Sequence, residues 1–153
     1  MNQKPTFDQT EVHRFYSAQC FNQAWGLIDK CDRTTDEDEE MIRLSQASIW
    51  HWTQREDCTP TNMSVGYWQA SRIYALLGHA DQARKYGRLS LDYSPDDAPF
   101  FSGYAHEALA RAEMVAGDKD EMNKHIDAAR QAAENVPDAK ARKMLVDDLN
   151  TIK

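Results

Sequence analysis

Helix-breaking residues divide this sequence into stretches of similar length. Proline or glycine stands at Pro60, Gly78, Pro95, Gly117 and Pro137. Between these points apolar residues recur every three or four positions, which is the period of an amphipathic helix. Proline cannot continue a helix through its interior, and glycine commonly follows the last helical turn. The spacing therefore predicts a series of helices joined by short turns.

The same pattern predicts an all-α fold. The sequence has no β-branched run, and no Asn-Gly or Asp-Gly turn lies between alternating segments, as a hairpin of strands would require. Short connections favour antiparallel neighbours. We expect about seven helices in a single domain over residues 1–153. The elements are hairpins at about 8–57, 62–94 and 97–136, followed by a terminal helix at about 138–151.

Polar residues ahead of the apolar stretches indicate where helices begin. Such side chains accept hydrogen bonds from the free N–H groups of a first helical turn. The first helix is expected from about residue 8 to 31. The expected caps, in chain order, are Asp8, Thr35 or Asp36, Thr61 or Asn62, Asp96 or Asp97, Asp118 and Asp138.

Charge and hydropathy exclude several classes of partner. The net charge is -7, and an acidic surface repels nucleic acid and anionic membrane. No apolar run approaches the ~20 residues that cross a bilayer. The first residues show no signal-peptide core, and three cysteines form an odd set typical of reduced thiols. These features predict a cytoplasmic protein.

Motifs for catalysis and for metal binding are missing. The five histidines form neither H-x3-H nor H-E-x-x-H, and there is no Cys-x2-Cys pair. The sequence also lacks a nucleophile elbow, a phosphate-binding loop and a dinucleotide fingerprint. We therefore expect no catalytic residues, no metal and no cofactor.

One stretch matches the spacing of a known helical repeat. A register that starts at an aromatic residue continues with a small pair, a tyrosine, a turn glycine, an alanine, a small residue and a proline. These positions are Tyr67, Ala70, Ser71, Tyr74, Gly78, Ala83, Gly87 and Pro95. A weaker second unit begins near His106, with Leu109 and Ala110 as its pair and Gly117 at its turn. Glu113 replaces its tyrosine, and Pro137 comes three residues late.

This spacing resembles the tetratricopeptide repeat (TPR) over residues 64–137. The segment from Gly66 to Gly78, together with His51-Trp52, looks like parts of small bacterial TPR-like proteins with no assigned function. The resemblance implies antiparallel hairpins stacked as a short right-handed superhelix. It also implies a protein or peptide partner held in a concave groove.

In such a fold the first helix of each hairpin lines the groove. The register then places Trp68 and Arg72 there from one hairpin, and Tyr104, Glu107 and Arg111 from the next. Two interpretations stay open. The two guanidinium groups can hold a carboxylate of a partner beside the aromatic rings. Alternatively, Arg72 pairs with Glu107, and Arg111 with Glu113 or Asp118, which would brace the hairpins.

A second group of aromatic residues lies at Trp50, His51 and Trp52. With Trp68 it can line a pocket for a small molecule, as in a sensor or an enzyme, or it can form core between the first two hairpins. Trp50 and Trp52 cannot face the same way on one helix, so at least one of them should be partly exposed or contact another chain. A structural homodimer is the third possibility, because short helical stacks leave end surfaces that a second copy can cover.

Overall fold

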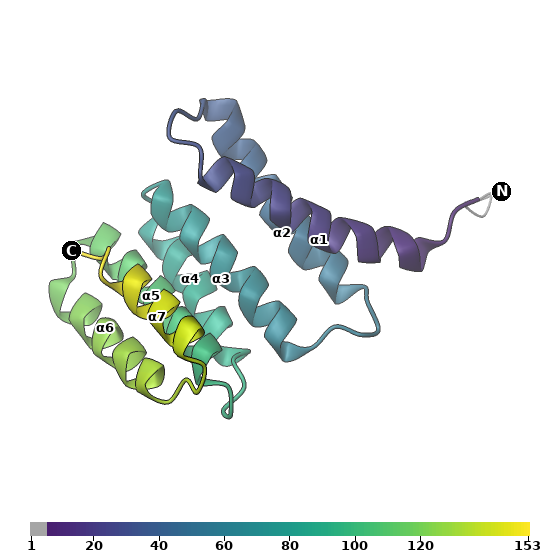
Figure 1. Cartoon of the computed structure of the whole chain (residues 1–153). Coiled ribbons are helices and arrows are strands. Elements are labelled where there is room, and N and C mark those ends of the chain that lie inside the picture. Colours follow the sequence, from purple (N-terminus) through teal and green to yellow (C-terminus); the bar gives the residue numbers. More distant parts are fainter. Residues whose placement is uncertain (1–5) are drawn as a thin grey trace. The chain divides into compact units, whose positions relative to one another are not determined.

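The computed structural model describes residues 6–153, and these residues form seven helices and no strand (Figure 1). The prediction of an all-α fold built from helical hairpins is confirmed. The helices are α1 (Gln9–Ile28), α2 (Thr35–Thr53), α3 (Pro60–Leu76), α4 (Ala80–Asp92), α5 (Pro99–Ala116), α6 (Lys119–Glu134) and α7 (Ala139–Leu149).

The chain divides into two compact units, the first ending at Thr59 and the second beginning at Pro60. The first unit contains the α1–α2 hairpin and the second contains α3 to α7. The boundary falls between the first and second hairpins expected from the sequence.

In the first unit, α1 and α2 pack against each other along their lengths. Asp8 caps α1 as expected, because its carboxylate accepts from the Thr10 N–H. A buried serine joins the two helices, since the Ser48 hydroxyl donates to the Ser17 carbonyl at 2.7 Å. The hairpin is therefore held by a polar contact as well as by packing of small residues.

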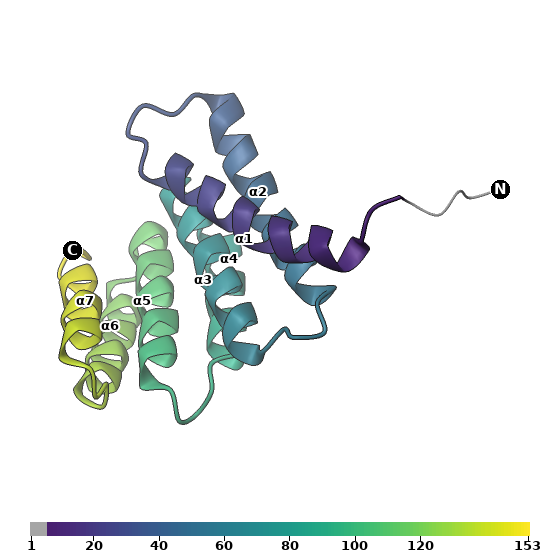
Figure 2. The same cartoon turned by 45° about the vertical axis from the view of Figure 1, so that its right-hand side comes forward.

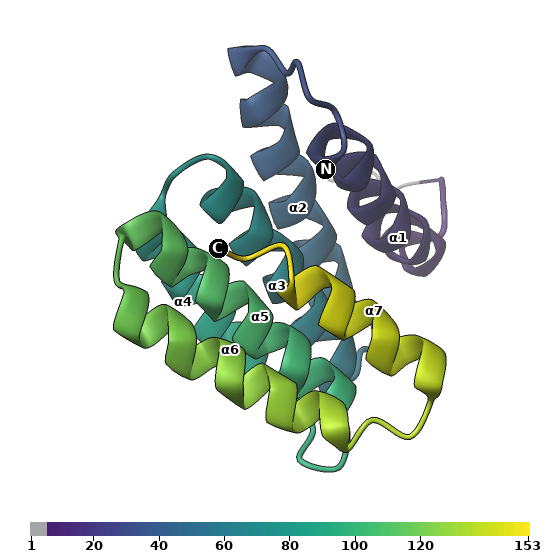
Figure 3. The ribbon, with the colours of Figure 1, turned by 60° about the vertical axis from the view of Figure 1, so that its left-hand side comes forward.

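The second unit has two layers of helices. α5 packs against α3 on one side and α7 on the other, so these three helices form one layer. α4 packs against α3 and α5, and α6 packs against α5 and α7, which forms the second layer (Figure 2). Figure 3 shows α7 lying beside α5 and α6. α5 is consequently the central helix of this unit.

Two glycines end helices in the second unit, as the sequence predicts. Gly78 and Gly117 have φ values of 81° and 78°, in the left-handed region that glycine adopts without steric cost. After α3, the His79 N–H donates to the Tyr74 carbonyl and the Gly78 N–H to the Ala75 carbonyl. This pair of bonds satisfies carbonyl groups that the end of the helix leaves free. Each glycine thus lets the chain reverse into the next helix.

The polar caps are partly as predicted. Asp118 caps α6 and Asp138 caps α7, each accepting an N–H three residues ahead. The prediction of Thr35 or Asp36 is wrong, because Thr34 forms a reciprocal capping box with Glu37.

Two further starts and one end differ from the prediction. α3 begins at Pro60, so Thr61 and Asn62 lie inside it; proline is favourable there because a first-turn N–H has no helical partner to lose. α5 begins at Pro99 after Ala98, whose side chain makes no cap, so the prediction of Asp96 or Asp97 is wrong. α1 ends at Ile28, three residues before the predicted end.

The core of the second unit depends on close approach between helices. Leu145 and Leu149 of α7 are fully or almost fully buried against a cluster that includes Tyr104 of α5. A Cβ atom on Gly103 would lie 2.5 Å from Leu145 Cδ2, and one on Gly87 would lie 2.8 Å from Leu109 Cδ2. Leucine side chains therefore fill the space that these glycines leave.

Candidate functional site

A fully buried carboxylate lies at the centre of the second unit. Glu107 on α5 has no exposed surface. Its oxygens accept hydrogen bonds from Trp68 Nε1 at 3.1 Å and Arg72 Nη1 at 3.1 Å, both on α3. Arg111, one turn further along α5, donates a third bond from its Nε. A buried carboxylate needs such partners, because an unpaired charge in the interior is strongly unfavourable.

Helix α7 completes this arrangement from the other side of α5. The Tyr104 hydroxyl donates to Asp148 Oδ2 at 2.7 Å. Arg111 Nη2 donates to the Asp148 carbonyl at 3.1 Å and to Thr151 Oγ1 at 2.7 Å. We call the six residues that span the three helices the Glu107 cluster: Trp68, Arg72, Tyr104, Glu107, Arg111 and Asp148.

The surroundings shift two titratable groups in the cluster. Burial lowers the pKa of Arg72, and the positive charge of Arg111 adds to this effect, while Glu107 and Asp148 oppose it. Burial raises the pKa of Tyr104, and its hydrogen bond to Asp148 raises it further. Tyr104 is therefore a protonated donor at neutral pH, and the charge of Arg72 is only partly compensated by its neighbours.

The five residues that the sequence places on one surface do come together in the structure. Arg72 pairs with Glu107, as the bracing interpretation expects. The partners suggested for Arg111 are wrong: Glu113 accepts from Arg84 Nε and Nη2 at 2.7 and 2.8 Å instead. Arg111 and Glu113 lie two residues apart on α5 and face different sides of the helix, whereas Glu107 lies one turn before Arg111 on the same side.

Two members of the arrangement were missed by the sequence analysis. Asp148 and Thr151 lie at the end of α7, and no local motif marks them as partners of Tyr104 and Arg111. Their positions depend on how α7 packs against α5, which the periodicity of either helix leaves open. Only the polar character of this helix end is visible in the sequence.

Arg72 makes fewer hydrogen bonds than Arg111, the other arginine of the cluster. Within the described part of the chain its guanidinium makes one hydrogen bond, to Glu107, although arginine has five N–H donors. Its side chain is 26% exposed, so solvent reaches it. Leu76, one turn further along α3, is 47% exposed and adds an apolar surface on the same side of the helix.

The aromatic group of the first unit has a different character. Trp50 is 55% exposed, whereas Trp52 is half-buried beneath the Arg55 guanidinium, 3.9 Å from its ring centre. The His51 ring faces His13 across the hairpin, with their Nδ1 atoms 2.8 Å apart. Trp68 belongs to the second unit. The rings of Trp50 and His51 pack against each other, with their centres 4.9 Å apart, and both contact His13, whereas Trp52 packs against Arg55.

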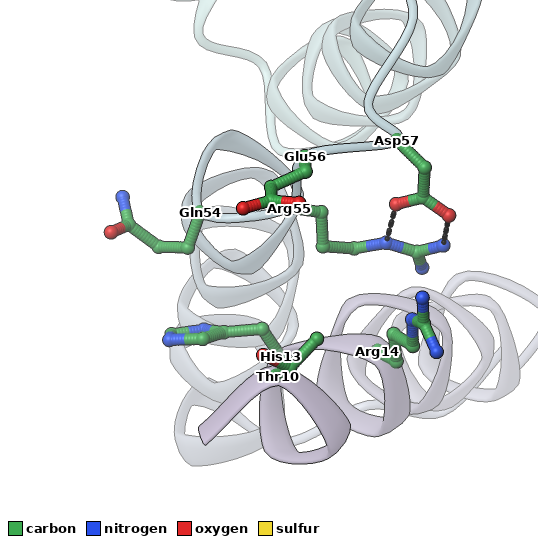
Figure 4. A pocket seen from close by; sticks show the side chains of 7 residues that line it. All are labelled: Thr10, His13, Arg14, Gln54, Arg55, Glu56 and Asp57. Carbon is green, nitrogen blue, oxygen red and sulfur yellow. Dashed lines mark hydrogen bonds and ion pairs between the residues drawn. The ribbon is translucent and has the colours of Figure 1, made fainter. Parts of the chain in front are cut away.

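A cavity of about 230 Å³ does lie in the first unit (Figure 4). Arg55 is held at its wall by two bonds to Asp57, at 2.8 and 2.7 Å, and by one bond to Ser17 at 2.9 Å. The hydrogen bond from Arg55 lowers the pKa of Asp57. Two charged groups of the wall, Arg55 and Asp57, thus pair with each other. The lining residues are Thr10, His13, Arg14, Gln54, Arg55, Glu56 and Asp57, so Trp50, His51 and Trp52 do not line it.

Comparison with known proteins finds no matching family model, curated protein or solved structure. Function is therefore inferred from the geometry of this chain. Among the described residues, no helix is long and apolar enough to span a membrane. No group of three or more metal-ligating side chains converges within residues 6–153.

Proposed function

We propose that the second unit is a binding module for a peptide or protein segment, which it holds on the surface formed by α3, α5 and α7. The observation that carries this proposal is the Glu107 cluster. It fixes Arg72 in a half-buried position from which a guanidinium with spare donors faces solvent. A cation held in this way loses little side-chain freedom when it binds an oxygen ligand.

The ligand that suits Arg72 is a carboxylate or a main-chain carbonyl. Planar guanidinium groups bind carboxylates with two parallel hydrogen bonds, and such charge-assisted bonds are stronger than neutral ones. Leu76 offers an apolar contact one turn away. An acidic residue or chain end beside an apolar side chain therefore fits this surface best.

The TPR-like identity of this unit is part of the same proposal. The alternation of α3, α5 and α7 with α4 and α6, and the turn glycines after α3 and α5, support it. A cytoplasmic location with no nucleic-acid or membrane partner also stays a prediction. The acidic net charge of -7 supports the second part of this prediction, the absence of nucleic-acid and membrane partners.

Selection of random peptides on the full chain, followed by affinity measurement with an enriched peptide, tests the proposal. Arg72→Gln should weaken binding by at least about tenfold, because a charged hydrogen bond contributes roughly 1.5–3 kcal/mol. Leu76→Ser should also weaken binding, without lowering stability, since this side chain is exposed. Arg88→Gln is the matched control, because Arg88 is an exposed arginine on α4.

The pattern across the three variants decides the outcome. Loss of affinity in Arg72→Gln and Leu76→Ser, with Arg88→Gln unchanged, supports the proposed surface. Failure to enrich any peptide, or equal affinity in the wild type and Arg72→Gln, contradicts the proposal.

A further inference from the structure

Four of the five histidines form two pairs across helical hairpins. His13 faces His51 in the first unit, and His106 on α5 faces His125 on α6 in the second. In each pair the contact joins the two Nδ1 atoms. No sequence motif marks these pairs, because their members lie 38 and 19 positions apart on different helices.

The His106–His125 pair brings two imidazole nitrogens close together between α5 and α6. Its Nδ1 atoms are 3.1 Å apart, and both rings are half-buried, so solvent reaches them. In a tetrahedral zinc site with Zn–N bonds of about 2.0–2.1 Å, two imidazole nitrogens lie about 3.3–3.4 Å apart. The ring centres are 5.4 Å apart, so the two nitrogens meet nearly head to head, and both rings must turn before their lone pairs point at one ion. The His13–His51 distance of 2.8 Å is further from this value.

The protonation state of the pair suits a metal ligand. Burial is the main cause that lowers the pKa of both His106 and His125, and a charge on His125 would lower that of His106 further. Both rings are therefore neutral at neutral pH, which is the form that binds metal. In the metal-free pair one ring is protonated at Nδ1 and donates a hydrogen bond to the unprotonated Nδ1 of the other ring. Metal binding requires the donor ring to move that proton to its Nε2, with no net release.

Charges around the pair largely balance. The negative charges of Glu113 and Glu121 act on His125, as do the positive charges of Arg88 and Lys124. Glu113 is already bound by Arg84, and Glu121 pairs with Lys124. These charged side chains therefore do not exclude a divalent cation. In the observed arrangement they supply no third ligand, so water would complete the coordination.

We propose that His106 and His125 form a binding site for a divalent transition metal of the Zn²⁺ class. Imidazole is a preferred ligand of this class of ion, and the two nitrogens are already brought together by the α5–α6 hairpin. The site is separate from Arg72 and does not depend on the proposed binding of peptides.

Calorimetric titration of the full chain with Zn²⁺ tests this site. To remove the other pair, all measurements are made on a His13→Gln/His51→Gln parent. The parent should bind one equivalent of Zn²⁺. His106→Gln and His125→Gln, each added to that parent, should lose this equivalent or weaken it by at least about tenfold, as even the loss of a supporting residue does in metal sites. His79→Gln, a histidine outside both pairs, should leave it unchanged.

Nitrogen-15 spectra of the histidine rings give a second readout. In the parent, Zn²⁺ should shift the Nδ1 resonances of His106 and His125 and leave that of His79 in place. The result that overturns the proposal is an absence of Zn²⁺ binding in the parent. Equal binding in the parent and both variants, all shown to be folded by circular dichroism, would overturn it as well.

Discussion

Gly103 lies where the second unit has little room for a side chain. A Cβ atom there would lie 2.5 Å from Leu145 Cδ2 and 3.4 Å from Ala132 Cβ. Leu145 is fully buried and cannot move without disturbing the core around it. Overpacking of this kind costs about 1–3 kcal/mol, while replacing glycine in a helix by alanine returns up to about 1 kcal/mol.

We therefore expect Gly103→Ala to lower the free energy of unfolding by about 1–2 kcal/mol, measured by urea denaturation. Gly26→Ala is the control with the opposite sign. Gly26 lies within α1, and a methyl group there would meet no atom within 4 Å, so only the gain in helix propensity remains. If Gly103→Ala were as stable as the wild type, the close approach of α5 and α7 would be incorrect.

At the scale of the helices, buried serines join α3 to α4. The Ser64 hydroxyl donates to the Ser90 carbonyl at 2.8 Å, and the Ser90 hydroxyl donates to the Ser64 carbonyl at 2.9 Å. About two turns after Ser64 on α3, the Ser71 hydroxyl donates to the Ala83 carbonyl of α4 at 2.8 Å. Small side chains let the two helices approach, and each hydroxyl finds a main-chain partner on the opposite helix.

We expect Ser64→Ala and Ser90→Ala each to destabilise the protein by about 1 kcal/mol, the usual net contribution of one hydrogen bond. The double variant should depart from the sum of the two, because the residues are in contact. Ser102→Ala is the matched control, since this hydroxyl bonds only within its own helix, to Pro99 at 3.2 Å. Equal stabilities for all three single variants would show that the reciprocal bonds contribute nothing specific.

The sequence predicts the helices and their ends better than it predicts which side chains pair between helices. Asp118, Asp138 and the two turn glycines were identified because a cap or turn is decided by residues within one helical turn. Thr34 was missed although its spacing to Glu37 is that of a capping box, since several polar residues compete there. The pairing of Arg111 with Glu107 follows a local pattern, because the two residues lie four positions apart on α5. The pairing of Glu113 with Arg84 of α4 depends on how the helices pack, which no local pattern gives.

At the scale of the whole molecule, histidines couple stability to pH in both units. Burial lowers the pKa of His51, with a further contribution from His13, and burial is also the main cause at His106 and His125. The unfolded chain has histidines with pKa values near 6.5 and therefore binds more protons than the folded chain below that pH. Stability is thus fully present above about pH 6.5 and decreases as the pH falls toward the lowered pKa values of the folded state.

The prediction is a free energy of unfolding that declines as the pH falls below about 6.5, by at most about 1.4 kcal/mol per pH unit for each proton taken up. Urea denaturation across this range, with a chelator present to exclude metal effects, measures it. His106→Gln/His125→Gln should flatten the decline, because the uncharged amides have no proton to gain; His79→Gln should not. A double variant with the wild-type slope would mean that the His106–His125 pair does not stay neutral in the folded protein, and the Nδ1 contact between α5 and α6 would then need another explanation.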